Sequence, residues 1–279
     1  MKKLLVFTDL DGSLLDHNDY SWQAARPALQ ALEENGFPVI YTSSKTSAEI
    51  LELRQETGNQ HPFISENGAV ANIPGMYFSD TCIRGEYSST PDSFLFGRAH
   101  AEIISLLNRL RHEHNYSFHG FYDMELDELI ELTDLDRRQA LNAVLRKATE
   151  PLLWKDTEEA LISFKEHVEN EGLLVTSGGR FLHVMSDVNK GNTVKWMAQR
   201  YQQAEPETDW VIVCIGDSVN DVPMLEVADR PVFILNPATK QPDVSFIANL
   251  VQTRLPGPAG WNEAMLAMVN ELLQENYHE

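Results

Sequence analysis

The chain has 279 residues, of which 43% are hydrophobic and 23% charged, and 42 acidic against 22 basic side chains give a formal net charge of −20. These proportions are typical of a globular protein, and the length exceeds the usual size of one domain, so two domains are expected. The acidity argues against a nucleic-acid partner, which needs a basic face, and no apolar run approaches the roughly 18 residues of a membrane span. An anionic small molecule stays compatible with the charge, because a bound divalent cation can make one site locally positive.

The first apolar run is too short for a signal peptide. Leu4–Phe7 is interrupted at once by Asp9, and no small-residue cleavage site follows. Cys82 and Cys214 lie far apart in the sequence, which predicts neither a disulfide framework nor a metal knuckle. A cytoplasmic protein is therefore expected.

The first quarter of the chain alternates short apolar runs with helical patterns. Strands are predicted at Leu4–Thr8, Phe37–Tyr41 and Pro62–Ile64, and helices at Trp22–Asn35 and Ser47–Thr57. Gly36 and Gly58 are the expected helix stops, and Thr46 or Ser47 is the expected cap of the second helix. This alternation with short links predicts a parallel sheet with helices on both faces.

The middle of the chain differs from both ends in its longer helical patterns and higher charge. Helices are predicted at Gly97–His114, Arg137–Lys147 and Thr157–Glu171, and strands at Tyr116–Phe121, Leu173–Thr176 and Phe181–Val184. We therefore expect residues 85–185 to form a separate α+β domain inserted into the α/β core. Its long acidic stretches are expected to be solvated faces.

The last third returns to the pattern of the first quarter. A helix from about Gly191 to Tyr201, strands at Val211–Ile215 and Pro231–Ile234, a linker-like stretch at Leu255–Gly260 and an amphipathic helix at Trp261–Gln274 are predicted. The predicted fold class is α/β, with a Rossmann-like, doubly wound parallel sheet formed by residues 1–84 and 186–279.

Two carboxylates follow the first strand. Asp9-Leu10-Asp11-Gly12 lies where a buried parallel strand ends, and ligands bind at that edge of open α/β sheets. One carboxylate can attack an electrophile while the other exchanges a proton with the leaving group and with water. On its own, the motif is also compatible with a strand-end turn that carries two solvated acids.

A second acidic motif, Gly216-Asp217-Ser218-Val219-Asn220-Asp221, also follows an apolar strand directly. Asp217 and Asp221 would bring further hard oxygen ligands, which Mg²⁺ prefers, with water and a substrate phosphate completing its shell.

Ser43 and Lys190 lie between the two motifs in the sequence, at another strand end and just before a helix. A hydroxyl and an ammonium can hold the oxygens of a phosphoryl group and neutralise charge during its transfer. Singly, each residue is better explained as a helix cap or a surface lysine. Together with the acidic motifs, they indicate phosphoryl chemistry.

These residues, in this order, resemble the haloacid dehalogenase superfamily of phosphatases; the set is Asp9-x-Asp11-Gly12, Ser43, Lys190-Gly191 and Gly216-Asp217-x-x-Asn220-Asp221. The long insertion between the third strand and the lysine is similar to the large-cap branch of that superfamily, in which the cap is an α/β domain. One small departure is Ser13, where Thr is usual; the hydroxyl is kept.

Four further segments resemble mannosyl-3-phosphoglycerate phosphatases, a narrower group within that branch. They are Tyr41–Thr46, Ser65–Ala69, Gly179–Val184 and Gly257–Trp261. The first discriminates, because most sugar-phosphate relatives carry Thr-Gly-Arg where this chain has Ser43-Ser44-Lys45.

The resemblance implies roles for these residues. Asp9 would be the nucleophile and a magnesium ligand, and Asp11 the general acid and base, which also gives the metal its backbone carbonyl. Asp217 would be the third protein ligand, and Asp221 would act through water or by fixing Lys190. Ser43 and Lys190 would hold the phosphoryl group. The residues expected to bind the rest of the substrate are Ser44, Lys45, Asn67, Gly68, Arg180 and His183.

The resemblance thus implies a magnesium-dependent phosphatase of a small sugar phosphate, with mannosyl-3-phosphoglycerate as the expected substrate. Arg180 and His183 are equally compatible with an ordinary salt bridge and a packed strand histidine. Another phosphorylated sugar or glycosyl-3-phosphoglycerate is the alternative substrate. Two other classes are considered: a signalling protein phosphorylated on aspartate, disfavoured because Asp11 would shorten the life of the acyl phosphate, and a non-catalytic binding module, disfavoured by the intact residue set.

Overall fold

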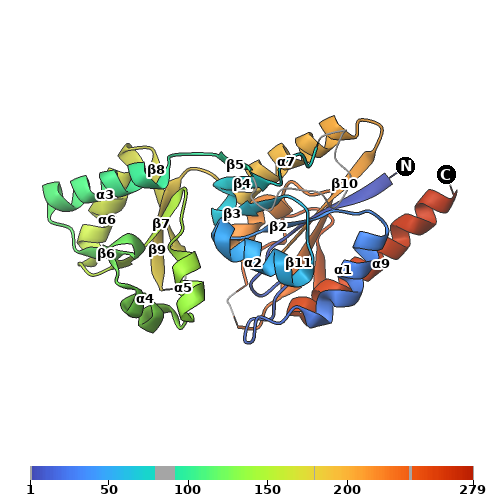
Figure 1. Ribbon diagram of the computed structural model, residues 1–279, viewed down its shortest axis with the longest axis horizontal. Helices are drawn as coiled ribbons and strands as arrows, with labels where there is room; N and C mark the ends of the chain where they lie inside the picture. The colour runs from blue at the N-terminus through green and yellow to red at the C-terminus, as the bar shows by residue number, and fades with distance from the viewer. Residues whose placement is uncertain (1, 79–91, 179, 239–240, 279) are drawn as a thin grey trace.

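The computed structural model describes residues 2–78, 92–178, 180–238 and 241–278. Cys82, Gly179 and the start expected for the insertion at Gly85 lie outside the described residues. Two sheets organise the chain (Figure 1). In spatial order the larger one comprises β12 (Val251–Pro256), β11 (Arg230–Leu235), β10 (Asp209–Gly216), β1 (Lys2–Thr8), β2 (Val39–Thr42), β3 (Phe63–Ser65), β4 (Val70–Ile73) and β5 (Asp92–Leu95).

Six strands of the larger sheet, β12 to β3 in that order, run parallel, and β4 and β5 complete it antiparallel. β1 is central and its residues Leu4–Thr8 are all buried, as expected of a strand covered on both faces. The predicted α/β class with a parallel sheet is confirmed.

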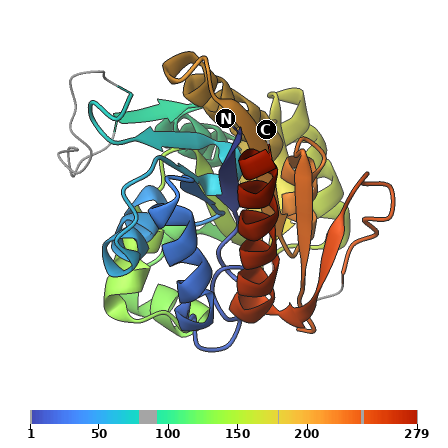
Figure 2. The same cartoon turned by 90° about the vertical axis from the view of Figure 1, so that its right-hand side faces the viewer.

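Helices cover both faces of this sheet. Leu4 and Val6 pack toward α1 (Arg26–Glu34), α2 (Ser47–Thr57) and α9 (Gly257–His278), and Figure 2 shows α9 running alongside α1. Leu5 and Phe7 pack toward α7 (Lys190–Ala204) and α8 (Val222–Leu225) on the other face. The period of two along β1 thus sends alternate side chains into two separate cores.

The smaller sheet is antiparallel and lies to one side of the larger (Figure 1). Its strands, in spatial order, are β6 (Phe118–Gly120), β7 (Thr149–Trp154), β9 (Phe181–Ser186) and β8 (Leu173–Gly178). One core joins it to α3 (His100–His114) and α6 (Glu158–Asn170), and a second small core holds α4 (Leu126–Thr133) and α5 (Arg137–Ala143). We call this sheet and α3–α6 the smaller lobe.

Three local expectations differ from the structure. The helix expected to reach Lys147 ends at Ala143, and β7 follows; the sequence concealed this central strand because it contains Pro151. The linker-like stretch Leu255–Gly260 is instead the end of β12 and the first turn of α9, where Pro258 is compatible with a helix start. β5 lies inside the range expected for the insertion and pairs with β4 in the larger sheet. The division into domains stays a prediction.

Candidate active site

Three buried aspartates meet where β1 and β10 end. Asp9 follows β1, Asp217 follows β10, and Asp221 lies in the turn after it. The two strands are parallel neighbours, with Thr8 paired to Ile215, so their carboxyl ends lie side by side. One carboxylate oxygen from each aspartate lies within 4.8 Å of the others, and all three residues are buried. The acidic cluster, as we call these three residues, therefore forms at the edge predicted from the sequence.

Lys190 is the cation of the cluster. Its Nζ lies 2.5 Å from Asp9 Oδ1 and 2.6 Å from Asp221 Oδ1, and its side chain is fully buried. Burial lowers the pKa of Lys190, but the carboxylates of Asp221 and Asp9 outweigh it and hold this pKa above its ordinary value. Lys190 therefore stays charged at neutral pH.

Asp221 is occupied by donors on both carboxylate oxygens. Oδ1 accepts from Lys190, while Oδ2 accepts from the backbone N–H groups of Asp217 and Ser218, each at 3.0 Å, and from Ser218 Oγ at 2.9 Å. This carboxylate fixes both the turn that presents Asp217 and the ammonium of Lys190.

Asp217 is held from two sides. Its Oδ1 accepts from Ser13 Oγ at 3.1 Å, and its Oδ2 accepts from Asn236 Nδ2 at 2.6 Å. Burial, and then the charge of Asp221, raise the pKa of Asp217 to about 6. Sequence reasoning missed Asn236; the available signal was its position directly after β11, the strand next to β10 in the parallel sheet.

Asp9 completes the cluster. Its pKa is raised well above the ordinary value, first by burial and then by Asp221, although Lys190 opposes both effects. Among the described contacts, Lys190 engages only Oδ1, so the second oxygen accepts no hydrogen bond. Three carboxylates face one buried ammonium, which leaves an excess of negative charge. Hard oxygen donors with uncompensated charge suit a divalent cation, so these residues could hold a metal ion.

Asp11 lies apart from the cluster and faces Lys45. Its Oδ2 is 2.8 Å from Lys45 Nζ, and its Oδ1 is buried without a hydrogen bond among the described residues. Gly12 has a φ of +83°, and an added Cβ would lie 2.7 Å from Asp217 Oδ2, so the turn needs glycine.

Ser43, Asn67 and Gly68 lie on neighbouring loops. Ser43 is buried directly after β2, and its Oγ accepts from Lys45 N at 3.2 Å. Asn67 Oδ1 accepts from Asn220 Nδ2 at 3.0 Å, which joins the turn after β3 to the second acidic motif. The structure thus places these predicted residues around one edge of the sheet.

Arg180 and His183 make their described contacts within the smaller lobe. Arg180 pairs with Asp134 at 3.3 Å, and 62% of its side chain is exposed. His183 lies on β9, where burial and then the charge of Arg146 lower its pKa to about 4. Arg146 also contacts Ser44, because its Nη1 donates a hydrogen bond to the Ser44 carbonyl oxygen at 3.3 Å.

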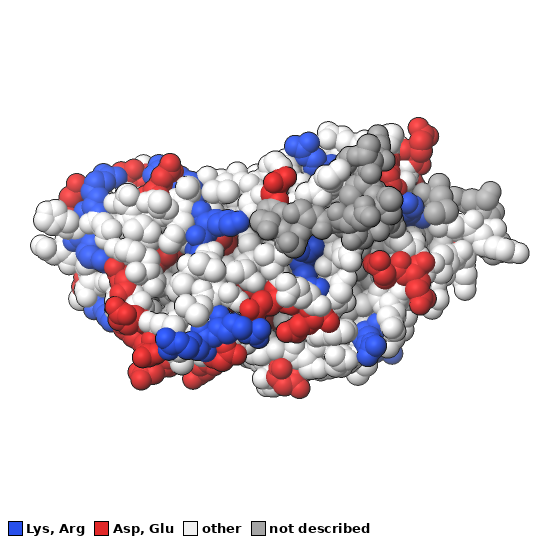
Figure 3. All heavy atoms as spheres, in the orientation of Figure 1, with Lys and Arg blue, Asp and Glu red and all other residues white. Residues whose placement is uncertain are grey.

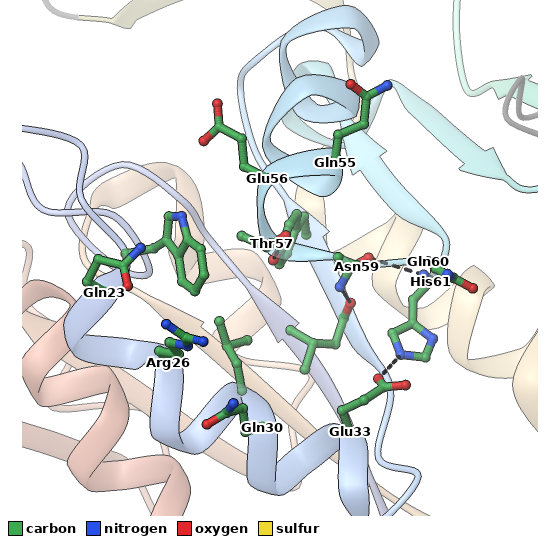
Figure 4. A pocket seen from close by; sticks show the side chains of 15 residues that line it. Gln23, Arg26, Gln30, Glu33, Gln55, Glu56, Thr57, Asn59, Gln60 and His61 are labelled. Carbon is green, nitrogen blue, oxygen red and sulfur yellow. Dashed lines mark hydrogen bonds and ion pairs between the residues drawn. The ribbon is translucent and has the colours of Figure 1, made fainter. Parts of the chain in front are cut away.

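A polar pocket of about 840 Å³ opens elsewhere, between α1 and the loop after α2 (Figure 4). Its lining contains none of the acidic cluster. Arg26, Glu33 and Glu56 line it together with several amide side chains, and His61 Nε2 lies 3.3 Å from Glu33 Oε2. This mixed charge does not select a phosphate.

Comparisons with known proteins show the family of this chain. A family described as haloacid dehalogenase-like hydrolase matches residues 6–241. A protein of Methanococcoides burtonii named glucosyl-3-phosphoglycerate/mannosyl-3-phosphoglycerate phosphatase is 36% identical over 273 residues, covering 96% of this chain and 98% of that protein. A protein of the same name from Persephonella marina is 34% identical over 270 residues, covering 96% and 98%.

Solved structures share the fold. A haloacid dehalogenase-like hydrolase from Bacteroides thetaiotaomicron superposes with a TM-score of 0.68 at 17% identity, covering 96% of this chain and all of that one (100%). At that identity, the similarity bears on the fold alone.

Proposed function

The chain belongs to the haloacid dehalogenase-like hydrolases, and from this premise we propose that it is a phosphatase that hydrolyses a small phosphate monoester through an aspartyl-phosphate on Asp9. One observation carries the proposal: the acidic cluster surrounds a fully buried lysine and leaves one oxygen of Asp9 without a hydrogen bond. That oxygen is free to attack phosphorus, while the other is fixed by Lys190.

The metal implied by the family is Mg²⁺. Asp9 and Asp217, with the backbone carbonyl of Asp11, would hold it, and Asp221 would act through its contact with Lys190. When bound, the ion offsets the negative charge of the cluster and of the phosphate, and it orients the phosphoryl group.

The chain's own residues would then carry the reaction. Asp9 forms a bond to phosphorus as the bond to the leaving oxygen breaks, and Asp11 gives that oxygen its proton. Asp11 next takes a proton from water, whose oxygen attacks the phosphoryl group and releases Asp9 and inorganic phosphate. Ser43 and Lys190 hold the phosphoryl oxygens through both steps.

For the substrate we propose mannosyl-3-phosphoglycerate, which would yield mannosylglycerate and phosphate. Support comes from the names of two relatives, each at least 34% identical over nearly the whole chain. Both names also include glucosyl-3-phosphoglycerate, which is the second candidate. The side chains proposed to bind the glycosyl and glycerate groups are Ser44, Lys45, Asn67, Gly68, Arg180 and His183. Lys45 lies nearest to the proposed chemistry, because its Nζ is 2.8 Å from Oδ2 of Asp11, the proposed acid and base.

The cellular setting is also a proposal. Among the described residues, no helix is both long and apolar enough to cross a bilayer. On the face drawn in Figure 3, basic side chains stand among acidic ones. The net charge of −20 supports a small-molecule partner rather than a nucleic acid, and the cytoplasm is the setting that we propose.

The test is phosphate release from a panel of sugar phosphates that includes both glycosyl-3-phosphoglycerates, with a generic aryl phosphate beside them. We expect magnesium-dependent turnover of the aryl phosphate and the highest kcat/KM on one of the glycosyl-3-phosphoglycerates. No turnover of any member with Mg²⁺ would refute a phosphatase. A preference for an unrelated sugar phosphate would refute only the substrate.

A further inference from the structure

The turn between β3 and β4 has a rare backbone conformation. Glu66 and Asn67 have φ angles of 52° and 58°, and Gly68 follows at 96°. Two consecutive residues with side chains in the left-handed region persist only where the surroundings fix them, and such strain gathers at functional sites. The contacts of this turn, residues 65–69, show what fixes it.

The side chain of Glu66 crosses from the larger sheet to the smaller lobe. It is fully buried, its Oε1 accepts from Lys147 N at 2.8 Å, and its Oε2 accepts from Ala148 N at 3.0 Å and Thr149 Oγ1 at 2.7 Å. These donors lie at the start of β7, so one carboxylate of the core holds a central strand of the other sheet.

The backbone of the same turn holds the loop after β2. Glu66 N donates to Lys45 O at 2.9 Å, and Asn67 N donates to Ser43 O at 3.0 Å. Ser43 and Lys45 are residues proposed to hold the substrate. A displacement of Glu66 would therefore be passed to them through backbone hydrogen bonds, which have little freedom to adjust.

The turn also holds the loops that carry the acidic cluster and Lys190. The side chain of Asn67 accepts from Asn220, as described above, and Gly68 O accepts from Thr193 Oγ1 at 2.5 Å. There is no room to move inward, since a Cβ on Gly68 would lie 2.5 Å from the carbonyl oxygen of Asn189. The turn thus packs closely against Asn189, the residue that precedes Lys190.

Two further hydrogen bonds reinforce this junction. Thr46 Oγ1 donates to Asn142 O at 2.9 Å, and Arg146 Nη1 donates to Ser44 O. Together with Glu66, they fix residues 142–149 of the smaller lobe against the loops after β2 and β3. Figure 1 shows α5, which ends at Ala143, on the side of the smaller lobe nearer to α2.

We propose that Glu66 is a positioning residue that couples the smaller lobe to the phosphate site: its carboxylate fixes the start of β7, and its turn fixes the loops of Ser43, Asn220 and Lys190. The coupling follows from the contacts alone, and only its consequence for turnover rests on the proposed function.

The first test is amide hydrogen exchange on Glu66→Gln. The substitution keeps the shape of the side chain but can place an NH₂ group against the N–H of Ala148, where both are donors. We expect at least tenfold faster exchange at residues 147–149, and also at 65–69 and 217–221. The matched control is Glu271→Gln, which removes a surface pair with Arg230 and should change none of these segments. Faster exchange confined to 147–149 would overturn the coupling.

Thr149→Val gives a second, milder variant from the opposite side of the contact. It removes one donor to Glu66 and one acceptor of Arg146 Nη1 without changing the size of the side chain much, so folding is less at risk. The same three segments should respond, more weakly, and adding Glu66→Gln should bring less than the sum of the two single effects. Fully additive effects in the double variant would show that the two residues act independently and would contradict the proposal.

Kinetics supply a measurement that a purely structural role would not move. At a temperature where Glu66→Gln is fully folded, we expect kcat to fall at least tenfold on the preferred glycosyl-3-phosphoglycerate, with KM changed less than threefold. Glu66→Asp, which keeps the charge, should recover part of this loss. An unchanged kcat in folded Glu66→Gln would refute the proposal. A wild-type protein inactive on every phosphate would refute the function instead, and hydrogen exchange would still decide the coupling.

Discussion

At the scale of single residues, Lys190 explains how three aspartates share one buried site. The carboxylates of Asp9 and Asp221 lie 2.5 and 2.6 Å from its ammonium, so none of these three charges is buried without a partner. Leaving one member of such a pair without its partner costs about 3–5 kcal/mol. The amide and hydroxyl donors of Asp217 lower its pKa, but burial and then the charge of Asp221 outweigh them and raise this pKa to about 6.

The two aspartates of the first motif should respond differently to the same substitution. Asp9→Asn should abolish turnover, because a neutral amide is a poor nucleophile. Asp11→Asn keeps the backbone carbonyl and should lower kcat by about 10²–10⁴-fold with substrate binding largely kept. Steady-state kinetics on both purified variants, with circular dichroism to confirm folding, make the comparison. Substantial turnover by Asp9→Asn would remove its assignment as the nucleophile.

At the scale of elements, the site is assembled from the carboxyl ends of neighbouring parallel strands. β1, β10, β11 and β2 deliver Asp9, Asp217, Asn236 and Ser43, each within one residue of the strand's end. Because neighbouring parallel strands end at the same edge, residues more than 200 positions apart come into contact without a long loop.

The strand-end position of Asn236 carries a prediction about the metal. Asn236→Ala would free Asp217 Oδ2 from its 2.6 Å hydrogen bond and let the carboxylate rotate. Substitution of a residue that orients a metal ligand in this way typically lowers metal affinity or activity by about 10–100-fold. We expect the Mg²⁺ concentration for half-maximal activity to rise by that factor. Asn276→Ala, which removes a contact with Lys2 elsewhere, is the control and should leave it unchanged. Equal behaviour of the two variants would contradict the role.

At the scale of the whole molecule, the smaller lobe contacts the loops after β2 and β3, and the sequence predicted the larger sheet and its helices better than the smaller lobe. Buried apolar strands with acidic ends, such as Leu4–Thr8 and Asp9, reveal both the sheet and its functional edge. The capping box of Thr46 and Glu49 begins α2 where expected, and the left-handed Gly58 ends it where expected. These signals are local.

The smaller lobe was less predictable because its decisive interactions are not local. Pro151 concealed β7, which forms only because β6 and β9 pair with it. Glu66 lies in an ordinary polar stretch, and its role appears only when residues 147–149, some 80 positions away, fold against it. Arg180 pairs with Asp134, which lies 46 positions away in the sequence, and no spacing rule indicates this partner.

Metal binding should stabilise the whole protein in a pH-dependent way. Without metal, the raised pKa of Asp217, from 3.8 to about 6, contributes stability that is fully present below pH 3.8 and is lost as pH rises through 6. A shift of that size corresponds to roughly 3 kcal/mol. Mg²⁺ relieves the repulsion between the carboxylates of Asp217 and Asp221 only once Asp217 has lost its proton. The Mg²⁺-induced increase in Tm should therefore be larger at pH 7.5 than at pH 5. An equal increase at both pH values would contradict this linkage.

Substrate selection tests how the two lobes act together. If Arg180 binds the glycerate carboxylate, it must leave Asp134, and Arg180→Ala should cost roughly 2–3 kcal/mol in kcat/KM on the preferred substrate. An aryl phosphate without a carboxylate should be turned over almost normally. Asp134→Asn is the matched variant, since it frees Arg180 and should not reduce kcat/KM. Equal losses on both substrates in Arg180→Ala would make Arg180 a structural residue of the smaller lobe.

The most direct test of the account is to trap the covalent intermediate on Asp9. Asp11→Asn should form the aspartyl-phosphate readily from an aryl phosphate, whose good leaving group needs no acid, but should hydrolyse it slowly because the base is lost. Rapid acid quench and peptide mass spectrometry of this variant with Mg²⁺ should show one phosphoryl group, on the amino-terminal peptide and at Asp9. A burst of released phenol with no phosphoryl group on Asp9 would contradict the account, and so would a phosphoryl group on another residue.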